Sequence, residues 1–248
     1  MTKFMSCKKQ GLQVLLINLI ILIPIVLFGS THNFSGEVSN LLGRFWGIIT
    51  HSAGSSGFLI TLFVLSLLVL TLKLPFKRLV CLGMQLAILL VLSFAAKTTL
   101  KSTTESPRPY TEFLAQQGVI ASPQAFYELD IDEKNSVIDS IDDEVSQWKS
   151  THWHGEKDYS FPSGHTIFVA ICLAFFGGLF LEQRKYWLVA GLLVWAGCVA
   201  YSRLWLGMHR PIDLAGSIIF GAIIYTVTPT FHNLIVERWI NRFIHKTE

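Results

Sequence analysis

Six long apolar runs limit what this chain can fold into. They lie at residues 11–29, 57–74, 79–98, 164–182, 186–206 and 211–233. Each run is close to the roughly 20 residues that a helix needs to cross the hydrocarbon core of a bilayer. Only 15% of the residues are charged, whereas soluble domains carry about 25%. The sequence therefore predicts an all-α integral membrane protein with six transmembrane helices.

The charges between these runs predict the orientation of the helices. Eleven Lys and Arg residues lie in the N-terminus, in the turns between runs two and three and between runs four and five, and in the C-terminal tail. Because short basic segments stay on the cytoplasmic side, we expect both termini inside. The first run follows Lys8 and Lys9. We expect it to remain an uncleaved helix, because its apolar core is longer than that of a signal peptide and no A-x-A site follows.

A long polar segment at residues 99–163 lies on the opposite side. From Lys97 to Asp158 the chain has twelve Asp and Glu against six Lys and Arg, a net charge of −6. Residues 126–150 are acidic and favour helix, which predicts two short amphipathic helices. We interpret most of these carboxylates as solvated groups without a direct role. Residues 1–248 are treated as a single membrane domain that contains this loop.

Several other classes of site are not favoured by the sequence. Three of the four cysteines lie in apolar runs and none lies in the long loop, so no disulfide framework or CxxC metal motif is present. No basic face with interleaved polar groups occurs, and we expect no nucleic-acid partner. His152 and His154 lack an obvious third ligand and are interpreted as loop histidines. No obligate protein partner is inferred.

Three polar clusters stand at ends of apolar runs on the side of the long loop. They read KSTTESPRP at 101–109, FPSGHT at 161–166 and SRLWLGMHRPID at 202–213. A charged group at bilayer depth costs roughly 2.5 kcal/mol or more, so charges gathered at one face indicate a functional site there. One polar group at a helix end is usually an anchor, but three clusters on one side predict a shared site.

The clusters contain the groups that bind a phosphate. Lys101, Arg108 and Arg203 supply three cations, which suit a doubly charged phosphate and the extra charge of its transition state. Ser163 and Gly164 follow a proline at the expected start of a helix, so we expect their amides to point outward. A helix N-terminus with free amides binds anions, and Gly164 lets a phosphate approach the backbone.

The histidines supply the reacting groups. His209 and Asp213 are four residues apart, and Pro211 between them predicts that a helix begins there. Helical spacing brings the carboxylate back towards His209, which fixes the tautomer and leaves the other ring nitrogen as a nucleophile. His165 remains as the general acid for the leaving group. The set indicates phosphoryl transfer through a phosphohistidine, with no metal or cofactor required.

The three clusters resemble the signature motifs Kx6RP, PSGH and SRx5Hx3D of the type 2 phosphatidic acid phosphatase (PAP2) superfamily. Every motif position agrees in this sequence. The long loop and the approach STHWHGEKDYSFPSGHT look most like the bacterial phosphatidylglycerophosphatase B branch.

The resemblance implies a metal-independent lipid phosphatase of the bacterial inner membrane with its site facing the periplasm. It implies that His209 is the nucleophile, Asp213 its partner and His165 the acid and then the base. The phosphate ligands that it implies are Lys101, Arg108, Ser163, Gly164 and Arg203. Relatives in that branch accept phosphatidylglycerophosphate, phosphatidate, diacylglycerol pyrophosphate and undecaprenyl pyrophosphate, and the motifs do not rank these lipids.

Two other functions remain open at this stage. A dedicated undecaprenyl pyrophosphate phosphatase for recycling the cell-wall lipid carrier would use the same residues. A non-catalytic membrane protein that binds lipid phosphates is less favoured, because such a protein is expected to lose the nucleophile or the acid.

Overall fold

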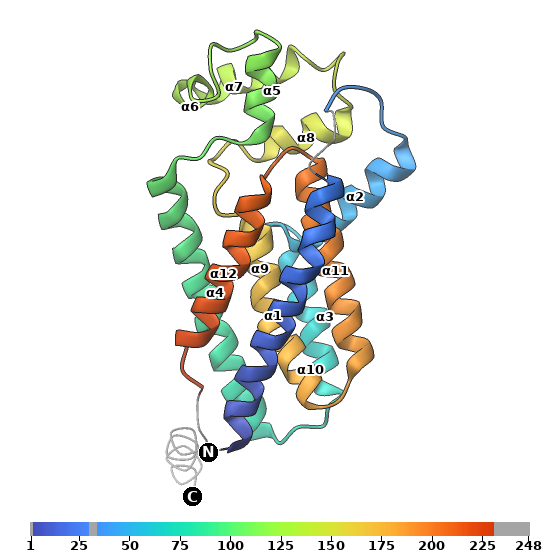
Figure 1. Ribbon diagram of the computed structural model, residues 1–248, viewed down its shortest axis with the longest axis vertical. Helices are drawn as coiled ribbons and strands as arrows, with labels where there is room; N and C mark the ends of the chain where they lie inside the picture. Colours follow the sequence, from blue (N-terminus) through green and yellow to red (C-terminus); the bar gives the residue numbers. More distant parts are fainter. Residues whose placement is uncertain (1, 30–33, 231–248) are drawn as a thin grey trace, which may run out of the picture.

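The computed structural model describes residues 2–29 and 34–230, which form helices joined by turns and contain no β-strand (Figure 1). In chain order the elements are α1 (Thr2–Gly29), α2 (Asn40–Ala53), α3 (Phe58–Leu70), α4 (Phe76–Thr104), α5 (Pro109–Gln116), α6 (Ala125–Glu128), α7 (Ile131–Asp139), α8 (Gln147–Gly155), α9 (Gly164–Cys172), the π-helical turn η1 (Leu173–Gly177), α10 (Gly178–Glu182), α11 (Tyr186–Trp205) and α12 (Pro211–Val227). The predicted all-α class is confirmed for this part of the chain.

Four helical segments in the described ranges are long and apolar enough to cross a membrane: Lys8–Gly29, Phe76–Gln116, Gly164–Glu182 and Tyr186–Trp205. The pair α2 and α3 adds a fifth if it is counted as one broken span. The apolar helix α12 has 17 described residues. The end of the sixth predicted run, after residue 230, lies outside the described residues. The six-span arrangement therefore stays a prediction.

The most buried helical segment is the continuous stack of α9, η1 and α10. Its residues are apolar on all sides, which is typical of a helix surrounded by other helices. α1, α4, α11 and α12 pack around it. α1 approaches closely at Gly11, where a Cβ atom would lie 2.4 Å from the Ala174 carbonyl oxygen. This packing brings the N-terminus of α9 to the same end of the bundle as the start of α12.

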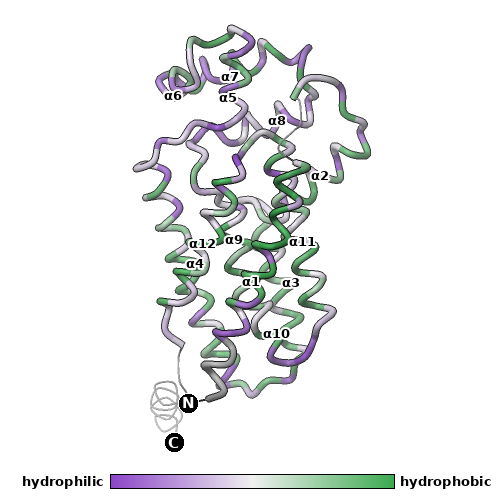
Figure 2. The backbone as a smooth tube through the Cα atoms, viewed as in Figure 1, coloured by the Kyte–Doolittle hydropathy of each residue, from purple (hydrophilic) through white to green (hydrophobic). Residues whose placement is uncertain are grey.

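A second hydrophobic core lies inside the segment that sequence analysis treated as a polar loop. Phe126, Ile138 and Trp153 come from α6, α7 and α8 and are fully buried together with Tyr110 of α5. Figure 2 shows more hydrophilic chain here than along the bundle helices. The two amphipathic helices predicted for residues 126–150 are in fact three elements, because polar turns at 129–130 and 140–146 interrupt the run.

The segment before the second predicted span also contains a helix, α2, which was not predicted from the sequence. α2 exposes the large apolar side chains of Leu41 and Ile48 and buries Thr50. It packs on α8 at Gly43, where a Cβ atom would meet the Trp148 ring at 2.3 Å. α2 and α3 meet at a bend of 72°. The bend turns residues 50–58 towards the polar end of the bundle.

The ends of the bundle differ as the charge pattern predicted. Figure 1 places the N-terminus and the α3–α4 and α10–α11 connections at one end, and α5 to α8 at the other. The connections carry Lys73, Arg184 and Lys185, and Lys77 lies in the first turn of α4. The basic residues of the C-terminal tail lie outside the described residues. Which end faces the cytoplasm stays a prediction.

Candidate active site

The site lies where the second core meets the end of α11. The Trp153 indole N–H donates to the Leu206 carbonyl oxygen at 2.7 Å, and its ring stacks on Tyr110 with centroids 5.0 Å apart. Leu206 and Met208 belong to the same buried cluster. The α5–α8 segment is thereby fixed on the turn that carries His209, and the three motifs meet there.

His209 and Asp213 form the pair that their spacing predicted. Pro211 is the first residue of α12, and the Asp213 carboxylate accepts the Arg210 amide N–H at 2.7 Å. His209 Nδ1 lies 3.6 Å from Asp213 Oδ2. Ser160 donates from Oγ to the same oxygen at 2.5 Å and lies 3.3 Å from His209 Nδ1. All three side chains are buried.

The neighbours of His209 determine its protonation. Its Nε2 lies 3.4 Å from Arg108 NH1, and a guanidinium can only donate, so Nε2 carries the lone pair and Nδ1–H faces Asp213. Burial holds the pKa of His209 below its ordinary value against the opposing effect of Asp213, and Arg108 adds to the lowering. At neutral pH the imidazole is uncharged, which is the form required of a nucleophile.

Arg203 lies at the last turn of α11 and is fully buried. Its NH1 donates to Thr50 Oγ1 of α2 at 2.7 Å, and its NH2 donates to both carboxylate oxygens of Glu156 at 2.8 Å. Its Nε has no hydrogen-bond partner in the described part of the chain. The guanidinium is held from two sides, and its Nε–H stays available as a donor.

Arg108 and Lys101 share a second carboxylate. Arg108 NH2 lies 2.5 Å from Asp158 Oδ1, and Lys101 Nζ lies 2.9 Å from Asp158 Oδ2. Arg108 also donates to the Met208 carbonyl oxygen at 3.0 Å. Arg108 is the N-cap of α5 and Lys101 lies in the last turn of α4. The short chain between them brings both cations to the turn that carries His209.

The PSGH motif forms the start of α9. Ser163 is the N-cap, and its hydroxyl accepts the Thr166 amide N–H at 3.3 Å. Its own amide N–H donates to Ser217 Oγ at 2.9 Å and so points into α12, where the sequence suggested that it faces outward. The use of Ser163 as a phosphate ligand stays a prediction. At Gly164 a Cβ atom would lie 2.7 Å from Lys97 Cδ.

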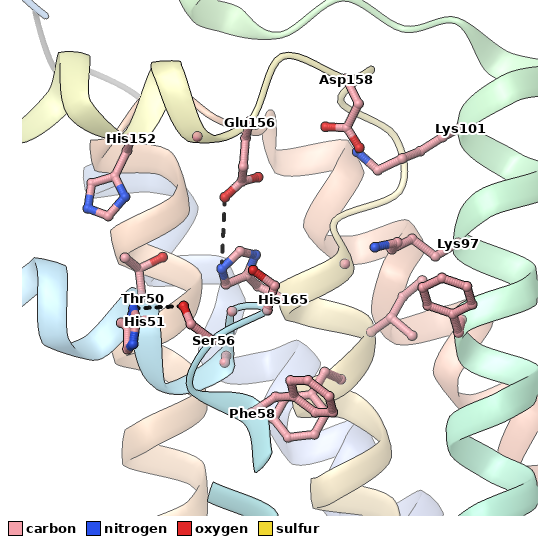
Figure 3. A pocket seen from close by; sticks show the side chains of 18 of the residues that line it. Thr50, His51, Ser56, Phe58, Lys97, Lys101, His152, Glu156, Asp158 and His165 are labelled. Carbon is pink, nitrogen blue, oxygen red and sulfur yellow. Dashed lines mark hydrogen bonds and ion pairs between the residues drawn. The ribbon is translucent and has the colours of Figure 1, made fainter. Parts of the chain in front are cut away.

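A cavity of about 650 Å³ opens beside this cluster (Figure 3). His165, Lys101 and Gly164 line it, whereas Arg108, Arg203 and His209 do not. Its apolar wall contains Leu90, Phe94, Phe58, Ile167 and Phe168. The predicted acid His165 and the predicted cation Lys101 therefore line the same cavity as a set of apolar side chains.

Several residues that the fold brings here were not predicted as site residues from the sequence. Glu156 and Asp158 were counted among the solvated acids of the loop, yet both pair with the predicted cations. Burial alone would raise the pKa of Glu156, but Arg203 and Arg108 hold it well below its usual range. Arg108 and Lys101 likewise lower the pKa of Asp158 against burial. The one feature of the sequence that could have indicated Glu156 and Asp158 as site residues is their position just before the PSGH motif.

Lys97, Thr50, Ser160 and His152 were also missed as site residues. Lys97 precedes Lys101 by one helical turn and lines the cavity together with Thr50 and His152. His154 instead contacts Asn135 and Asp139 away from the cavity. Within the described residues no group of three or more His, Cys, Asp and Glu side chains is placed to hold a metal ion.

Comparison with known proteins gives concordant matches. Residues 78–236 match the PAP2 superfamily. A phosphatidylglycerophosphatase B of Haemophilus influenzae is 32% identical over 86% of this chain and 92% of its own length. A phosphatidylglycerophosphatase B of Escherichia coli is 31% identical over 74% of this chain and 69% of its own length. An undecaprenyl-diphosphatase of Bacillus subtilis is 34% identical over 32% of this chain and 38% of its own.

Proposed function

The chain belongs to the PAP2 superfamily, and from that premise we propose that it is a membrane lipid phosphatase. Its proposed reaction converts phosphatidylglycerophosphate to phosphatidylglycerol through a phosphohistidine, without a metal. Phosphatidate, diacylglycerol pyrophosphate and undecaprenyl pyrophosphate are proposed as further substrates. The site is proposed to face the periplasm from a six-span domain in the inner membrane.

The proposed first step forms a bond between His209 Nε2 and phosphorus. Arg108, Arg203 and Lys101 neutralise the phosphate oxygens, with the Gly164 amide at the N-terminus of α9. His165 gives a proton to the leaving oxygen as the bond between phosphorus and that oxygen breaks. In the second step His165 takes a proton from water, which attacks phosphorus and releases phosphate and neutral His209.

One observation carries this proposal. His209 has a carboxylate on Nδ1 and a lone pair on Nε2 directed towards Arg108, within a buried group that contains Arg203. A histidine that only binds phosphate does not need this tautomer, whereas a nucleophile does. The arrangement therefore favours catalysis over the non-catalytic lipid-phosphate-binding alternative.

The choice of phosphatidylglycerophosphate rests on the extent of similarity. The phosphatidylglycerophosphatase B matches cover most of this chain, whereas the undecaprenyl-diphosphatase match covers about a third. The dedicated undecaprenyl pyrophosphate phosphatase remains the second candidate because that partial match exists. In both cases the apolar wall of the cavity suits acyl or prenyl chains entering from the bilayer.

The test is phosphate release by the purified protein in detergent from a panel of the four lipids. We expect the highest kcat/KM on phosphatidylglycerophosphate, activity in excess EDTA and inhibition by orthovanadate. His209→Ala is the matched inactive control. Release from undecaprenyl pyrophosphate alone would support the second candidate, and wild-type protein that binds the lipids without phosphate release would support the binding protein.

A further inference from the structure

We propose that Glu156 is a positioning residue. When a phosphate binds, the Glu156 carboxylate leaves Arg203 and Arg108 and pairs with His165. Beside His165, the carboxylate would orient the ring, as Asp213 orients His209, and would favour the protonated form of the imidazole. The inference rests on the proposed phosphatase function and adds a role that the three motifs do not contain.

Glu156 occupies the place expected for the phosphate. Its two oxygens accept from Arg203 NH2 at 2.8 Å each, and Oε2 lies 3.1 Å from Arg108 NH2. Guanidinium groups bind carboxylates and phosphates with the same fork of donors. A phosphate that binds both arginines through the NH2 groups that now hold Glu156 therefore displaces this carboxylate.

The lining of the cavity agrees with such a displacement. Glu156 and Asp158 line the cavity, whereas Arg108 and Arg203 do not. A substrate in the cavity therefore meets the carboxylates before the arginines. Asp158 is paired with Lys101 and Arg108, so each of the three predicted cations pairs with Glu156 or Asp158, and the two carboxylates balance two of the three positive charges until a phosphate arrives.

His165 is the nearest alternative partner for Glu156 (Figure 3). Its Nε2 lies 3.9 Å from Glu156 Oε1, so a shift of about 1 Å gives hydrogen-bond distance. At Gly54, in the turn between α2 and α3, a Cβ atom would lie 2.9 Å from the same nitrogen. Glycine at this position leaves the Nε2 side of the ring open to the carboxylate.

Charge makes the exchange favourable only when a phosphate is present. The charged and titratable groups that act most strongly on His165 are Arg203, Glu156, His209 and Arg108. The cavity that His165 lines also contains His51, Lys97, Lys101, His152 and Asp158. With no phosphate bound, the arginines oppose an imidazolium and hold Glu156. A dianionic phosphate neutralises the arginines and repels the carboxylate towards His165, where an adjacent negative charge favours the imidazolium. Phosphate binding and protonation of the acid are thereby coupled.

The proton balance is simple. His165 takes one proton from solvent in the cavity, and Glu156 stays ionised throughout. Nε2–H donates to Glu156, so Nδ1–H is the proton that passes to the leaving oxygen when its bond to phosphorus breaks. His165 then returns to the neutral form that serves as base for water.

The experiment compares kcat as a function of pH, and the inhibition constant of inorganic phosphate, in wild type and Glu156→Gln. We expect phosphate to bind about tenfold more tightly to the variant, or 1.4 kcal/mol, because its competitor has lost its charge. We expect kcat to fall about tenfold or more, but by less than the roughly 10²–10⁴ that the general acid itself contributes. The alkaline limb of kcat should move to lower pH by about one unit.

Three controls separate this role from a structural one. Asp158→Asn removes a carboxylate that pairs with Lys101 and Arg108 but not with His165, so the alkaline limb should not move. In a His165→Ala background, Glu156→Gln should cause no further loss of kcat, because the two residues act as one unit. Glu156→Asp, which keeps the charge, should restore part of the pH profile.

The proposal is overturned if the alkaline limb is the same in wild type and Glu156→Gln, or if the losses from Glu156→Gln and His165→Ala are additive. A wild-type protein that releases no phosphate from any lipid would instead refute the proposed function. The two failures are therefore distinguishable.

Discussion

The two histidines of the site differ in how firmly they are held. His209 is fixed by Asp213, Ser160 and Arg108, whereas the ion-pair neighbour of His165 is a carboxylate 3.9 Å away. A residue that keeps one tautomer needs a permanent partner, and a residue that changes its charge during the reaction needs an adjustable one. The difference fits a nucleophile and an acid–base group.

At this scale we expect His209→Ala to abolish turnover and Asp213→Asn to reduce kcat by about a thousandfold or more. The asparagine keeps the shape but cannot hold the Nδ1–H tautomer, and an analogous substitution in a serine protease triad costs about 10⁴. Phosphate release in detergent measures both effects. Gel filtration of the variants should match wild type, and full activity of His209→Ala would refute the nucleophile assignment.

The ion pairs of Glu156 also predict how stability depends on pH. Its folded-state pKa lies well below 4.5, so the carboxylate stabilises the fold fully above about pH 4.5 and loses this contribution as pH falls through the folded value. The difference in unfolding free energy between wild type and Glu156→Gln should therefore be largest at neutral pH and shrink on acidification. Thermal unfolding in detergent between pH 7 and pH 3 measures it.

The matched control is Glu112→Gln. Glu112 pairs with Arg210 at the surface, and exposed pairs contribute about 0–1 kcal/mol. A difference for Glu156→Gln that is no larger than this, or that grows as pH falls, would contradict the assigned pairing.

At the scale of helices, the site depends on how α8 docks on the end of α11. The fully buried Trp153 joins the two through its ring packing and its hydrogen bond to Leu206. The chain from Glu156 to Ser160 leaves α8 directly after this anchor. The docking of one tryptophan therefore sets the position of both missed carboxylates and of Ser160.

We expect Trp153→Ala to destabilise the protein by about 3–5 kcal/mol, the usual range for removing a buried tryptophan. Trp153→Phe should lose less, about 1–2 kcal/mol, because it keeps most of the packing and removes the hydrogen bond. Chemical unfolding in detergent measures both. Ile131→Ala on α7, whose side chain is 69% exposed, is the control and should change stability by less than about 0.5 kcal/mol.

At the scale of the whole molecule, the basic connections and the candidate site lie at opposite ends of the helix bundle. The basic α3–α4 and α10–α11 connections lie at the end opposite α5 to α8 (Figure 1). Because short basic segments are retained in the cytoplasm, this separation predicts that the site is exported. A lipid phosphatase with this topology would act on lipids of the outer leaflet of the inner membrane.

A β-lactamase reporter tests this topology. Inserted at residues 117–124, in the exposed turn between α5 and α6, it should confer resistance because the enzyme must be exported to act on its drug. The same reporter in the α10–α11 turn at residues 183–185 should confer none. The reverse pattern would invert the orientation, and resistance from both insertions would contradict the number of spans between them.

The all-α class and the proximity of His209 to Asp213 could be predicted from sequence alone, for a physical reason. Apolar runs of membrane length and basic connections are local properties of the chain, and the spacing of His209, Pro211 and Asp213 is a local helical relation. The extra helix α2 was missed because its short amphipathic pattern is weaker than that of a span.

Only the tertiary structure decided which carboxylates pair with the predicted cations. Glu156 lies far along the chain from both Arg108 and Arg203, and its pairing with them depends on how Trp153 docks α8 on α11. Likewise the Ser163 amide is directed into α12 by packing with Ser217. A carboxylate in an acidic loop looks the same in sequence whether it faces water or two buried arginines, because burial is a property of the assembled fold.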